Sequence, residues 1–446
     1  MLTVIERPER MNLRGLLPNI DKIRSRDFPL FEKYGRIYLD STATSQEPQS
    51  VKDKMYEYRS THIRGSNHSK NSAEAREAQQ RQEESREKLK QFFGSYNYLT
   101  GFTAGTTDSS NWVATRFPFE KGDVLVITEA EHNSQILTAR NMAREKGADV
   151  YYVPVNLPDG RLDLERFRKI ASQRKKGKIL LDLVHASNVS GVINPVEEIR
   201  EILGNRGFIY LDMAQSAGHI PINLDKLDVD FAGLSAHKIY GPTGIGAVFI
   251  NKKSQRYITN RISGGSAVDL ISEWFTNSPK SQARFEPGTQ NLEGVIEFGF
   301  VLDYLKEIGM DKIEAHDQEV GKYFLGQLLK IPGVNIYGPT DFKNRTSTIA
   351  FNVGSYKRKN YDKVAQELDK EGISLRDGCF CAHIYAAQLL GIPKILNDAR
   401  AGLMKIGVSA ELMKLPGAVR ASFAFYNTPE EAYTALTKIE KIAKND

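Results

Sequence analysis

The segment LSAHKIYGPTGIG, from Leu234 to Gly246, carries the most information about the fold and chemistry of this chain. Lys238 follows a run of small and polar residues and precedes a turn rich in glycine and proline. Glycines let the backbone pass close to a ligand, and small hydroxyl side chains bond phosphate groups. A lysine becomes a nucleophile when burial or a nearby cation keeps its amine neutral, and the apolar neighbours of Lys238 allow this. An ordinary loop lysine is the alternative interpretation.

Apolar strands alternate with helical patterns on either side of this segment. The strand-like runs are VLVIT (124–128), ILLDLVHA (179–186), FIYLD (208–212) and GIGAVFI (244–250). This alternation predicts an α/β domain with a mainly parallel sheet, in which ligands bind beyond the carboxyl ends of the strands. From about residue 306 the pattern becomes mixed, which predicts a second, α+β domain.

Two further segments have helical patterns. Residues 72–93 are highly charged, and an ordinary surface helix explains them. Residues 291–331 predict long helices with apolar residues on one face.

Polar residues at the strand ends suit one cofactor, pyridoxal 5'-phosphate (PLP). Asp212 ends FIYLD, with Gln215 three residues on, and a carboxylate is needed to keep the pyridine nitrogen protonated. TAGTTDSSN (103–111) offers backbone N–H groups and hydroxyls for a phosphate. His132 follows VLVIT, where an imidazole can stack on a flat ring and relay protons. A helix cap or a structural histidine explains any one of these residues, but the combination with Lys238 favours a PLP site.

The same segments match a known family. They are YLDSTATS, IRGSNH, TAGTTDSSN, TEAEHN, ASNVSGVINPV, LDMAQSAGH, LSAHKIYGPTGIGAVF, RFEPGTQN, RDGCFCAH and VRASFAFYNT. From about Tyr38 almost to its end, the sequence resembles the class V PLP-dependent aminotransferases, and within them the SufS-like cysteine desulfurases. The resemblance implies fold type I of the PLP-dependent transferases, an α/β fold. It has a large domain with a mainly parallel, seven-stranded type of sheet and a smaller α+β domain.

Roles around the cofactor are implied by the resemblance at matching positions. Lys238 matches the lysine that binds PLP covalently, Asp212 the partner of the pyridine nitrogen, and His132 the catalytic histidine stacked on the ring. Gln215 and Asn188 match groups around the ring oxygen and the substrate. The phosphate contacts match Thr106, Thr107, Ser235 and His237.

The resemblance also implies where the substrate and a second subunit contact the site. Thr289, in EPGTQN, matches a threonine that reaches the phosphate of a neighbouring subunit, so a homodimer is expected. Arg420, in VRASF, matches the arginine that binds the substrate carboxylate through its planar fork. His68 and Asn188 are expected beside the substrate.

The two cysteines, both in RDGCFCA, decide the expected chemistry. In the RxGxxCA pattern of the resembled family the last cysteine is the nucleophile, which is Cys381 here, and its thiolate is the attacking species. Arg376, Arg420 and His383 are expected to lower the pKa of this thiol. A buried structural thiol is the alternative for Cys381. For Cys379 the alternatives are resolving the persulfide, tuning Cys381 or packing, and we favour packing.

The expected reaction converts L-cysteine to L-alanine and leaves sulfur on Cys381 as a persulfide, for delivery to an acceptor protein. Iron–sulfur cluster assembly, tRNA thiolation and molybdenum cofactor stay open as destinations. Other class V activities remain alternatives: selenocysteine lyase, molybdenum-cofactor-sulfurase-like enzyme, aminotransferase or epimerase. A PLP-binding scaffold without turnover is the alternative outside enzymes.

We expect three regions. Residues 1–36 form an N-terminal segment that packs with the small domain, residues 37–305 form the large PLP-binding domain, and residues 306–446 form the small α+β domain with Cys381 and Arg420. The stretch between Cys381 and Arg420 is longer than in typical SufS-like enzymes, and we expect a lid or an acceptor-docking element there.

Composition excludes several classes of protein. The chain has 446 residues and a net charge of +6, from 61 basic and 55 acidic residues, with no dense basic patch that predicts nucleic-acid binding. No apolar run approaches the roughly 20 residues of a membrane helix, and no secretory signal is visible. Two cysteines exclude a disulfide framework and a four-thiolate zinc site. We therefore expect a cytoplasmic protein without a metal centre.

Overall fold

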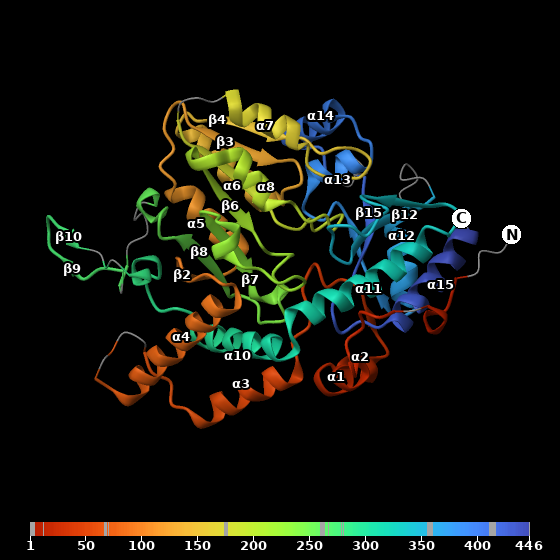
Figure 1. Cartoon of the computed structure of the whole chain (residues 1–446), viewed down its shortest axis with the longest axis horizontal. Coiled ribbons are helices and arrows are strands. Elements are labelled where there is room, and N and C mark those ends of the chain that lie inside the picture. The colour runs from red at the N-terminus through yellow and green to blue at the C-terminus, as the bar shows by residue number, and fades with distance from the viewer. Residues whose placement is uncertain are drawn as a thin grey trace.

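The computed structural model describes residues 5–11, 13–66, 69, 71–173, 177–258, 264–265, 267–277, 279, 281–354, 360–409 and 416–445. Figure 1 shows a large sheet with helices on both faces, and a smaller sheet with its own helices beside it. None of the helices among these residues is long and apolar enough to cross a lipid bilayer.

The large sheet has seven strands in the order β2-β8-β7-β6-β5-β3-β4. They are β2 (Tyr98–Thr103), β3 (Val124–Thr128), β4 (Asp149–Val153), β5 (Ile179–Val184), β6 (Gly207–Asp212), β7 (Phe231–Ser235) and β8 (Gly246–Asn251). The neighbours from β7 to β4 pair in parallel, whereas β8 runs antiparallel to both β2 and β7. The predictions of strands at VLVIT and FIYLD and of a mainly parallel sheet are confirmed.

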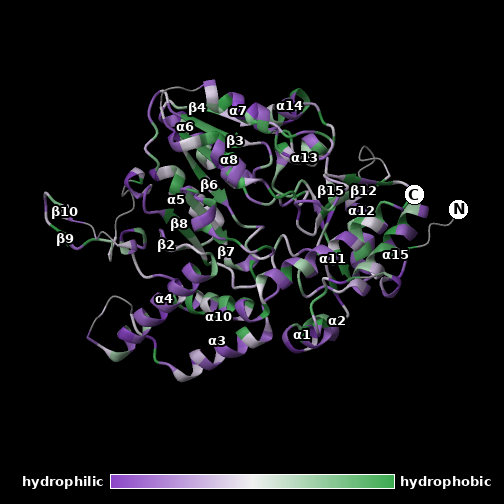
Figure 2. Cartoon of the chain, in the orientation of Figure 1, coloured by the Kyte–Doolittle hydropathy of each residue, from purple (hydrophilic) through white to green (hydrophobic). Residues whose placement is uncertain are grey.

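Alternate residues of these strands face two separate hydrophobic layers. Leu125 and Ile127 pack with α5 (Thr106–Arg116) and α6 (Asn133–Glu145). Val124 and Val126 face the opposite layer. That layer contains residues of α7 (Leu164–Gln173), α8 (Val196–Leu203), α9 (Leu224–Leu227) and α10 (Leu292–Ile308). Burial on both faces explains why the strands read as continuous apolar runs. Figure 2 shows this hydrophobic concentration in the sheet.

The helix at 72–93 is more than a surface helix. It forms α4 (Ala73–Phe92), which packs against α10, and α3 (Gln49–Thr61) also contacts α10. Arg86 of α4 is buried, and its Nη1 lies 2.8 Å from Oε1 of Glu286. The sequence did not reveal this role of Arg86. A buried arginine paired with a carboxylate and an exposed ion pair use the same residue types, so composition cannot tell them apart.

The second sheet has four antiparallel strands in the order β11-β12-β15-β14. They are β11 (Val334–Tyr337), β12 (Thr348–Val353), β14 (Arg376–Gly378) and β15 (Ala418–Ser422). This sheet shares a hydrophobic cluster with α11 (Met310–Leu328), α12 (Asn360–Lys370) and α15 (Pro429–Asn445). The predicted long helices at 291–331 are confirmed as α10 and α11. The N-terminal Ile5 belongs to the same cluster, and the expected domain boundaries stay predictions.

Short elements complete the described chain. The helices α1 (Ile20–Asp27) and α2 (Pro29–Tyr34) precede β1 (Ile37–Tyr38), which pairs with β13 (Ile373–Ser374). The hairpin of β9 (Leu270–Ile271) and β10 (Thr276–Asn277) projects from the body at the left of Figure 1. The stretch between Cys381 and Arg420 contains α13 (His383–Leu389) and α14 (Lys394–Lys405). The 3-10 turns are Pro8–Arg10, Gly204–Arg206, Ala236–Lys238, Gln255–Tyr257 and Gln282–Phe285.

Candidate active site

A cavity of about 90 Å³ lies at the carboxyl ends of β5, β6 and β7, where an open parallel sheet places its ligands. Of the ten residues that the sequence predicts to hold the cofactor, nine line this cavity. They are Thr106, Thr107, His132, Asn188, Asp212, Gln215, Ser235, His237 and Lys238. The fold therefore brings together residues from segments more than 100 positions apart in the chain.

Lys238 projects its amine into this cavity from the 3-10 turn that follows β7. Burial lowers the pKa of the amine, and the charge of Arg420 lowers it further. The charges of Asp212 and Cys381 act in the opposite direction. Lys238 thus experiences the strand-end carboxylate, the arginine and the thiol together. A lysine with a lowered pKa is the kind that serves as a nucleophile and base.

Asp212 ends β6 with both carboxylate oxygens fixed. Its Oδ1 accepts a hydrogen bond from the backbone N of Ala214 at 2.8 Å. Its Oδ2 accepts one from Nε2 of Gln135 at 3.1 Å. A carboxylate held in this way keeps one orientation toward the cavity, as a partner of a protonated ring nitrogen requires.

The first turn of α5 forms a polar cradle on another side of the cavity. The backbone N of Thr106 donates to Oγ of Ser235 at 2.8 Å, and the two hydroxyl groups also lie 2.8 Å apart. Gly105 precedes the helix with φ 150°, and a Cβ there would meet Oγ of Ser235 at 3.0 Å. The positive end of a helix and converging hydroxyls bind phosphate. Burial lowers the pKa of His237, beside this cradle, to about 4, so its ring is neutral.

His132 caps the start of α6 beside the cavity. Its Nδ1 accepts a hydrogen bond from the backbone N of Ser134 at 3.2 Å, so the proton of the neutral ring sits on Nε2. Burial lowers the pKa of His132, and the charge of Lys238 adds to that effect. A neutral, fixed imidazole is suited to stacking on an aromatic ring and to moving a proton.

These groups fit PLP. The amine of Lys238 suits its aldehyde, the carboxylate of Asp212 its ring nitrogen, and the cradle of α5 its phosphate. Asn188 also lines the cavity, and its buried Oδ1 has no hydrogen-bond partner within the described chain. A buried polar atom without a partner marks a position where a bound group completes the hydrogen bonding.

The second cysteine of RDGCFCA lies on a turn that the cavity residues anchor. Nδ2 of Asn188 donates to the backbone O of Phe380 at 2.7 Å. Arg420 stacks over the Phe380 ring at 5.0 Å. The backbone O of Cys381 accepts from N of Asn133, the residue after His132, at 2.7 Å. Cys381 itself is exposed, so the alternative of a buried structural thiol is wrong.

Arg420 is buried on β15 at the edge of this region. Its Nη1 donates to the backbone O of Asn188 at 2.9 Å, and its Nη2 pairs with Oδ1 of Asp40 at 2.7 Å. A buried guanidinium with a single carboxylate partner can exchange that partner for another carboxylate in the same fork. The sequence did not assign Asp40 a role, although it lies within the YLDSTATS segment.

For three other expected residues, the structure leaves the expectation untested or gives a different geometry. Thr289 lines a different cavity, beside Trp112 and Phe285. His68 lies outside the described residues. The expectation that His383 acts on Cys381 meets a different geometry, because Nε2 of His383 lies 3.1 Å from Sγ of Cys379.

Sequence reasoning also missed supporting residues. Gln135, which holds Asp212, and Ser134, which fixes the ring of His132, lie in the helix after TEAEHN. Phe380, between the two cysteines, links the turn to Asn188 and Arg420. Their contacts depend on tertiary packing, and no pattern of spacing in the sequence reports it.

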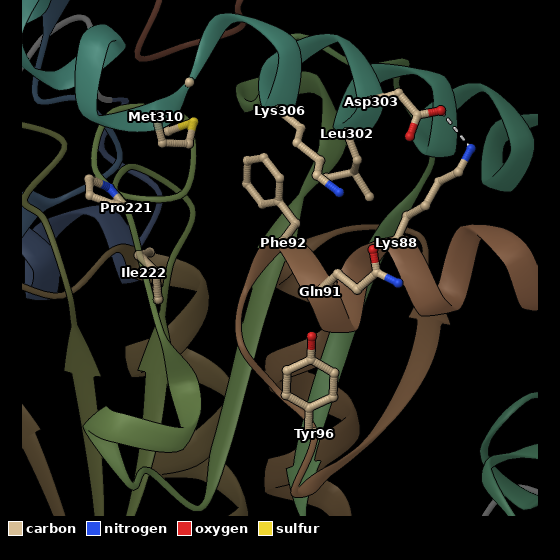
Figure 3. Close-up of a pocket in the computed structure, with 11 residues that line it drawn as sticks. Lys88, Gln91, Phe92, Tyr96, Pro221, Ile222, Leu302, Asp303, Lys306 and Met310 are labelled. Atoms are coloured by element: carbon tan, nitrogen blue, oxygen red, sulfur yellow. Dashed lines mark hydrogen bonds and ion pairs between the residues drawn. The ribbon is translucent and has the colours of Figure 1, made fainter.

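A larger cavity of about 440 Å³ lies elsewhere, between α4 and α10. Figure 3 shows its lining, where Lys88 pairs with Asp303 at 2.7 Å and Lys306 extends from α10. It has polar and apolar residues but lacks the strand-end carboxylate, histidine and cradle of the smaller cavity. Volume alone therefore does not identify the reaction site.

Comparisons with known proteins agree with this geometry. The family model for aminotransferase class-V matches residues 37–434. A probable cysteine desulfurase of Halalkalibacterium halodurans is 33% identical over 91% of this chain and 92% of the relative. A cysteine desulfurase of Escherichia coli (strain K12 / DH10B) is 32% identical over 95% of this chain and 98% of the relative.

Solved structures give the same picture. The apo structure of a cysteine desulfurase from Thermococcus onnurineus NA1 superimposes with a TM-score of 0.84 at 31% identity, covering 96% of this chain and 99% of that one. The cysteine desulfurase CsdA (S-sulfonic acid) from Escherichia coli gives a TM-score of 0.80 at 25% identity, covering 96% and 99%.

Proposed function

Because this chain belongs to the class-V aminotransferase family, we propose that it is a PLP-dependent cysteine desulfurase. It takes sulfur from L-cysteine, releases L-alanine and holds the sulfur on Cys381 as a persulfide. The proposal is supported by relatives that are called cysteine desulfurases and that match nearly the whole chain.

One observation carries the proposal furthest. Cys381 lies on a turn that Asn188 and Arg420 contact through Phe380, and its charge acts on the amine of Lys238. A transaminase requires no thiol at this place. A sulfur-accepting enzyme requires one that is accessible and aligned with the substrate-binding arginine.

The cavity residues have distinct tasks in this reaction. Lys238 would hold the cofactor, Asp212 would keep its ring nitrogen protonated, and the residues at the start of α5, with Ser235 and His237, would hold its phosphate. When bound, PLP acts as an electron sink for the bond broken at Cα. His132, which lines the same cavity, would stack on the ring and move protons.

The substrate side of the reaction uses Arg420, Lys238 and Cys381. The carboxylate of L-cysteine replaces Asp40 as partner of Arg420, and the neutral amine of Lys238 takes the proton from Cα. The thiolate of Cys381 attacks the substrate sulfur, a new S–S bond forms, and the Cβ–S bond breaks. Its electron pair stays on the substrate carbon, which Lys238 or His132 protonates, and alanine leaves.

The test is the release of alanine and sulfide from L-cysteine in the presence of a thiol reductant. We expect equal amounts of both products from the wild type and neither from Cys381→Ser. The proposal fails if the variant matches the wild type or if neither protein makes alanine.

We also propose that the working form is a homodimer. Thr289 is not among the residues that line the cofactor cavity of its own chain, which fits a residue that reaches the phosphate site of a second copy. The β9–β10 hairpin exposes a strongly apolar tip, with Trp274 83% and Phe275 80% exposed. Apolar side chains of this size rarely stay in solvent unless they have a partner.

Light scattering tests the dimer through this hairpin. Trp274→Ser combined with Phe275→Ser is expected to shift the protein toward the mass of one chain and to weaken cofactor binding. Ile395→Ser, at an 80% exposed position on α14, is the matched control and keeps the dimer. A wild type with the mass of a single chain contradicts the proposal.

We further propose that persulfide sulfur passes to an acceptor protein in the cytoplasm, with iron–sulfur cluster assembly as the process served. The support is the exposure of Cys381, because sulfur held on an exposed thiol is open to a second protein. Mixing sulfur-loaded enzyme with candidate acceptors, and following loss of sulfur from Cys381, tests this step.

A further inference from the structure

Cys379 lies within a group of hydrogen-bond donors that the reaction at Cys381 does not use. Nε2 of His383 lies 3.1 Å from Sγ of Cys379. Burial raises the pKa of the Cys379 thiol, whereas the backbone N–H groups of Cys381 and Cys379 act in the direction that lowers it. Several donors directed at one atom stabilise negative charge there. Packing alone, the interpretation favoured by the sequence, does not account for such a set.

Asn133 fixes which ring nitrogen of His383 carries the proton. The backbone N of His383 donates to Oδ1 of Asn133 at 3.2 Å, so the amide nitrogen is the group that faces the ring. Nδ2 of Asn133 lies 2.6 Å from Nδ1 of His383. Because an amide N–H₂ only donates, Nδ1 accepts and Nε2 keeps its hydrogen. His383 therefore presents an N–H donor to the sulfur of Cys379.

The neutral form of His383 is the form expected at ordinary pH. Burial lowers the pKa of its ring. The ring thus acts as a fixed donor, positioned by Asn133 from the start of α6. Asn133 also donates its backbone N–H to the carbonyl of Cys381, so one residue orients both cysteines.

A tight turn carries both cysteines. The backbone N of Ala382 donates to O of Cys379 at 3.0 Å. Between them Phe380 and Cys381 have φ angles of 56° and 53°, which is the pattern of a type I′ turn. The charge of Cys381 also acts to raise the pKa of the Cys379 thiol.

We propose that Cys379 is a second sulfur carrier, which takes the outer sulfur of the persulfide formed on Cys381. The inference rests on the proposed function and names the next step of the same site. A carrier role for Cys379 explains why hydrogen-bond donors contact its sulfur, although Cys381 is the thiol that attacks the substrate. Transfer frees Cys381 for another substrate molecule.

The step balances without an added oxidant or reductant. Cys379 loses its proton to solvent, and its thiolate attacks the outer sulfur of the Cys381 persulfide. A new S–S bond forms at Cys379 while the S–S bond at Cys381 breaks. The electron pair of the broken bond stays on Sγ of Cys381, which takes a proton from solvent.

The experiment follows one sulfur atom through a single turnover of the cofactor-loaded enzyme. L-Cysteine is added in an amount equal to the sites, without reductant, and samples are quenched at intervals with iodoacetamide. Fragmentation of the peptide that contains both cysteines assigns the sulfur to one of them by mass spectrometry.

In the wild type we expect sulfur first on Cys381 and then on Cys379. In Cys379→Ser the sulfur stays on Cys381, and the alanine formed in the first turnover is unchanged. His383→Ala slows the movement to Cys379 by about tenfold or more, because a hydrogen bond to a charged group is lost. Gln388→Ala is the matched control, because Gln388 lies on the same helix but lines a separate cavity with Glu129 and Arg140. It leaves the transfer of sulfur to Cys379 unchanged.

Two results overturn the inference while leaving the proposed function intact. Sulfur that reaches Cys381 and never Cys379 rules out the second carrier. A Cys379–Cys381 disulfide with release of sulfide shows that Cys379 resolves the persulfide instead of carrying it. Sulfur on Cys379 in Cys381→Ser shows direct loading from the substrate, and this result overturns both the inference and the role of Cys381 in the proposed function. Absence of sulfur and alanine in the wild type contradicts the proposed function itself.

Discussion

The cofactor cavity and the cysteine turn (residues 378–382) belong to one site but differ in how far their reactive groups are buried. The cavity lies at the ends of buried parallel strands, where burial lowers the pKa of Lys238 and hydrogen bonds fix Asp212. The cysteine turn follows β14 of the small sheet, exposes Cys381 and places two non-glycine residues at positive φ.

The difference reflects what each region has to do. Proton transfer needs groups with displaced pKa values, and these need burial and fixed neighbours. Sulfur delivery needs a thiol that reaches both the substrate and a later acceptor, so this thiol cannot be buried. Asn188 and Arg420 connect the regions, since both lie by the cavity and both contact Phe380 of the turn.

The largest effect is expected from removing the amine of the cavity. Lys238→Ala loses both the covalent hold on the cofactor and the base, so the rate of alanine formation should fall by about 10⁴-fold or more. Lys306→Ala, in the larger cavity of Figure 3, is the control and should retain full activity. Equal losses in the two variants would mean that the smaller cavity is not the reaction site.

A smaller effect is expected from the residue that joins the two regions. Arg420→Lys keeps the charge but loses the planar fork, so kcat/KM for L-cysteine should fall about 10- to 100-fold, mainly through KM. Steady-state kinetics measure the split between kcat and KM. Arg376→Lys, opposite Arg420 in the register of β14 and β15, should change KM little. An unchanged KM in Arg420→Lys would remove it from substrate binding.

The buried region should be the one whose stability depends on pH. Asp182 of β5 is buried, and burial together with the charge of Asp212 raises its pKa to about 8. Its folded pKa lies above the ordinary value of 3.8. The proton on Asp182 therefore makes its full contribution to the free energy of unfolding below pH 3.8. This contribution is lost as the pH rises through about 8.

Asp182→Asn cannot ionise and should abolish this loss. Thermal unfolding at about pH 6 and about pH 9 should show a difference in stability that is smaller in the variant by about 1–2 kcal/mol. Asp303→Asn, at a position 45% exposed, should leave the difference as in the wild type. The same pH dependence in Asp182→Asn and the wild type would contradict the account of this buried acid.

The smallest expected effect comes from backbone strain in the cysteine turn. A non-glycine residue at positive φ costs about 1–2 kcal/mol, and glycine does not carry this cost. Cys381→Gly should therefore be more stable than Cys381→Ala by about 1 kcal/mol, while neither variant makes alanine. Chemical denaturation compares the two inactive proteins, and greater stability of Cys381→Ala would mean that the turn is not strained.

The sequence predicted the cavity better than the turn. Lys238, Asp212 and His132 each sit next to a strand whose apolar run is visible, and the parallel sheet brings strand ends together. Cys381 was found through the RxGxxCA pattern, whereas its anchors depend on contacts between segments about 190 residues apart, such as Asn188 with Phe380. Such distant contacts leave no periodic trace in the sequence.

The same limit explains the other differences. The burial of Arg86 in α4 depends on Glu286, 200 positions away, and the pairing of His383 with Cys379 depends on the course of a turn with unusual φ angles. Local patterns indicate helices and strands because their periods are local. They do not indicate which of two nearby thiols a histidine will contact.

The most direct test of the central claim is the amount of alanine formed per cofactor-loaded site in the first turnover, without reductant, in wild type and Cys381→Ser. We predict one alanine per site in the first turnover of the wild type, and a sharp slowing once both Cys381 and Cys379 hold sulfur. Cys381→Ser should form none. Alanine from Cys381→Ser in the wild-type amount would contradict the role of Cys381 as the sulfur acceptor.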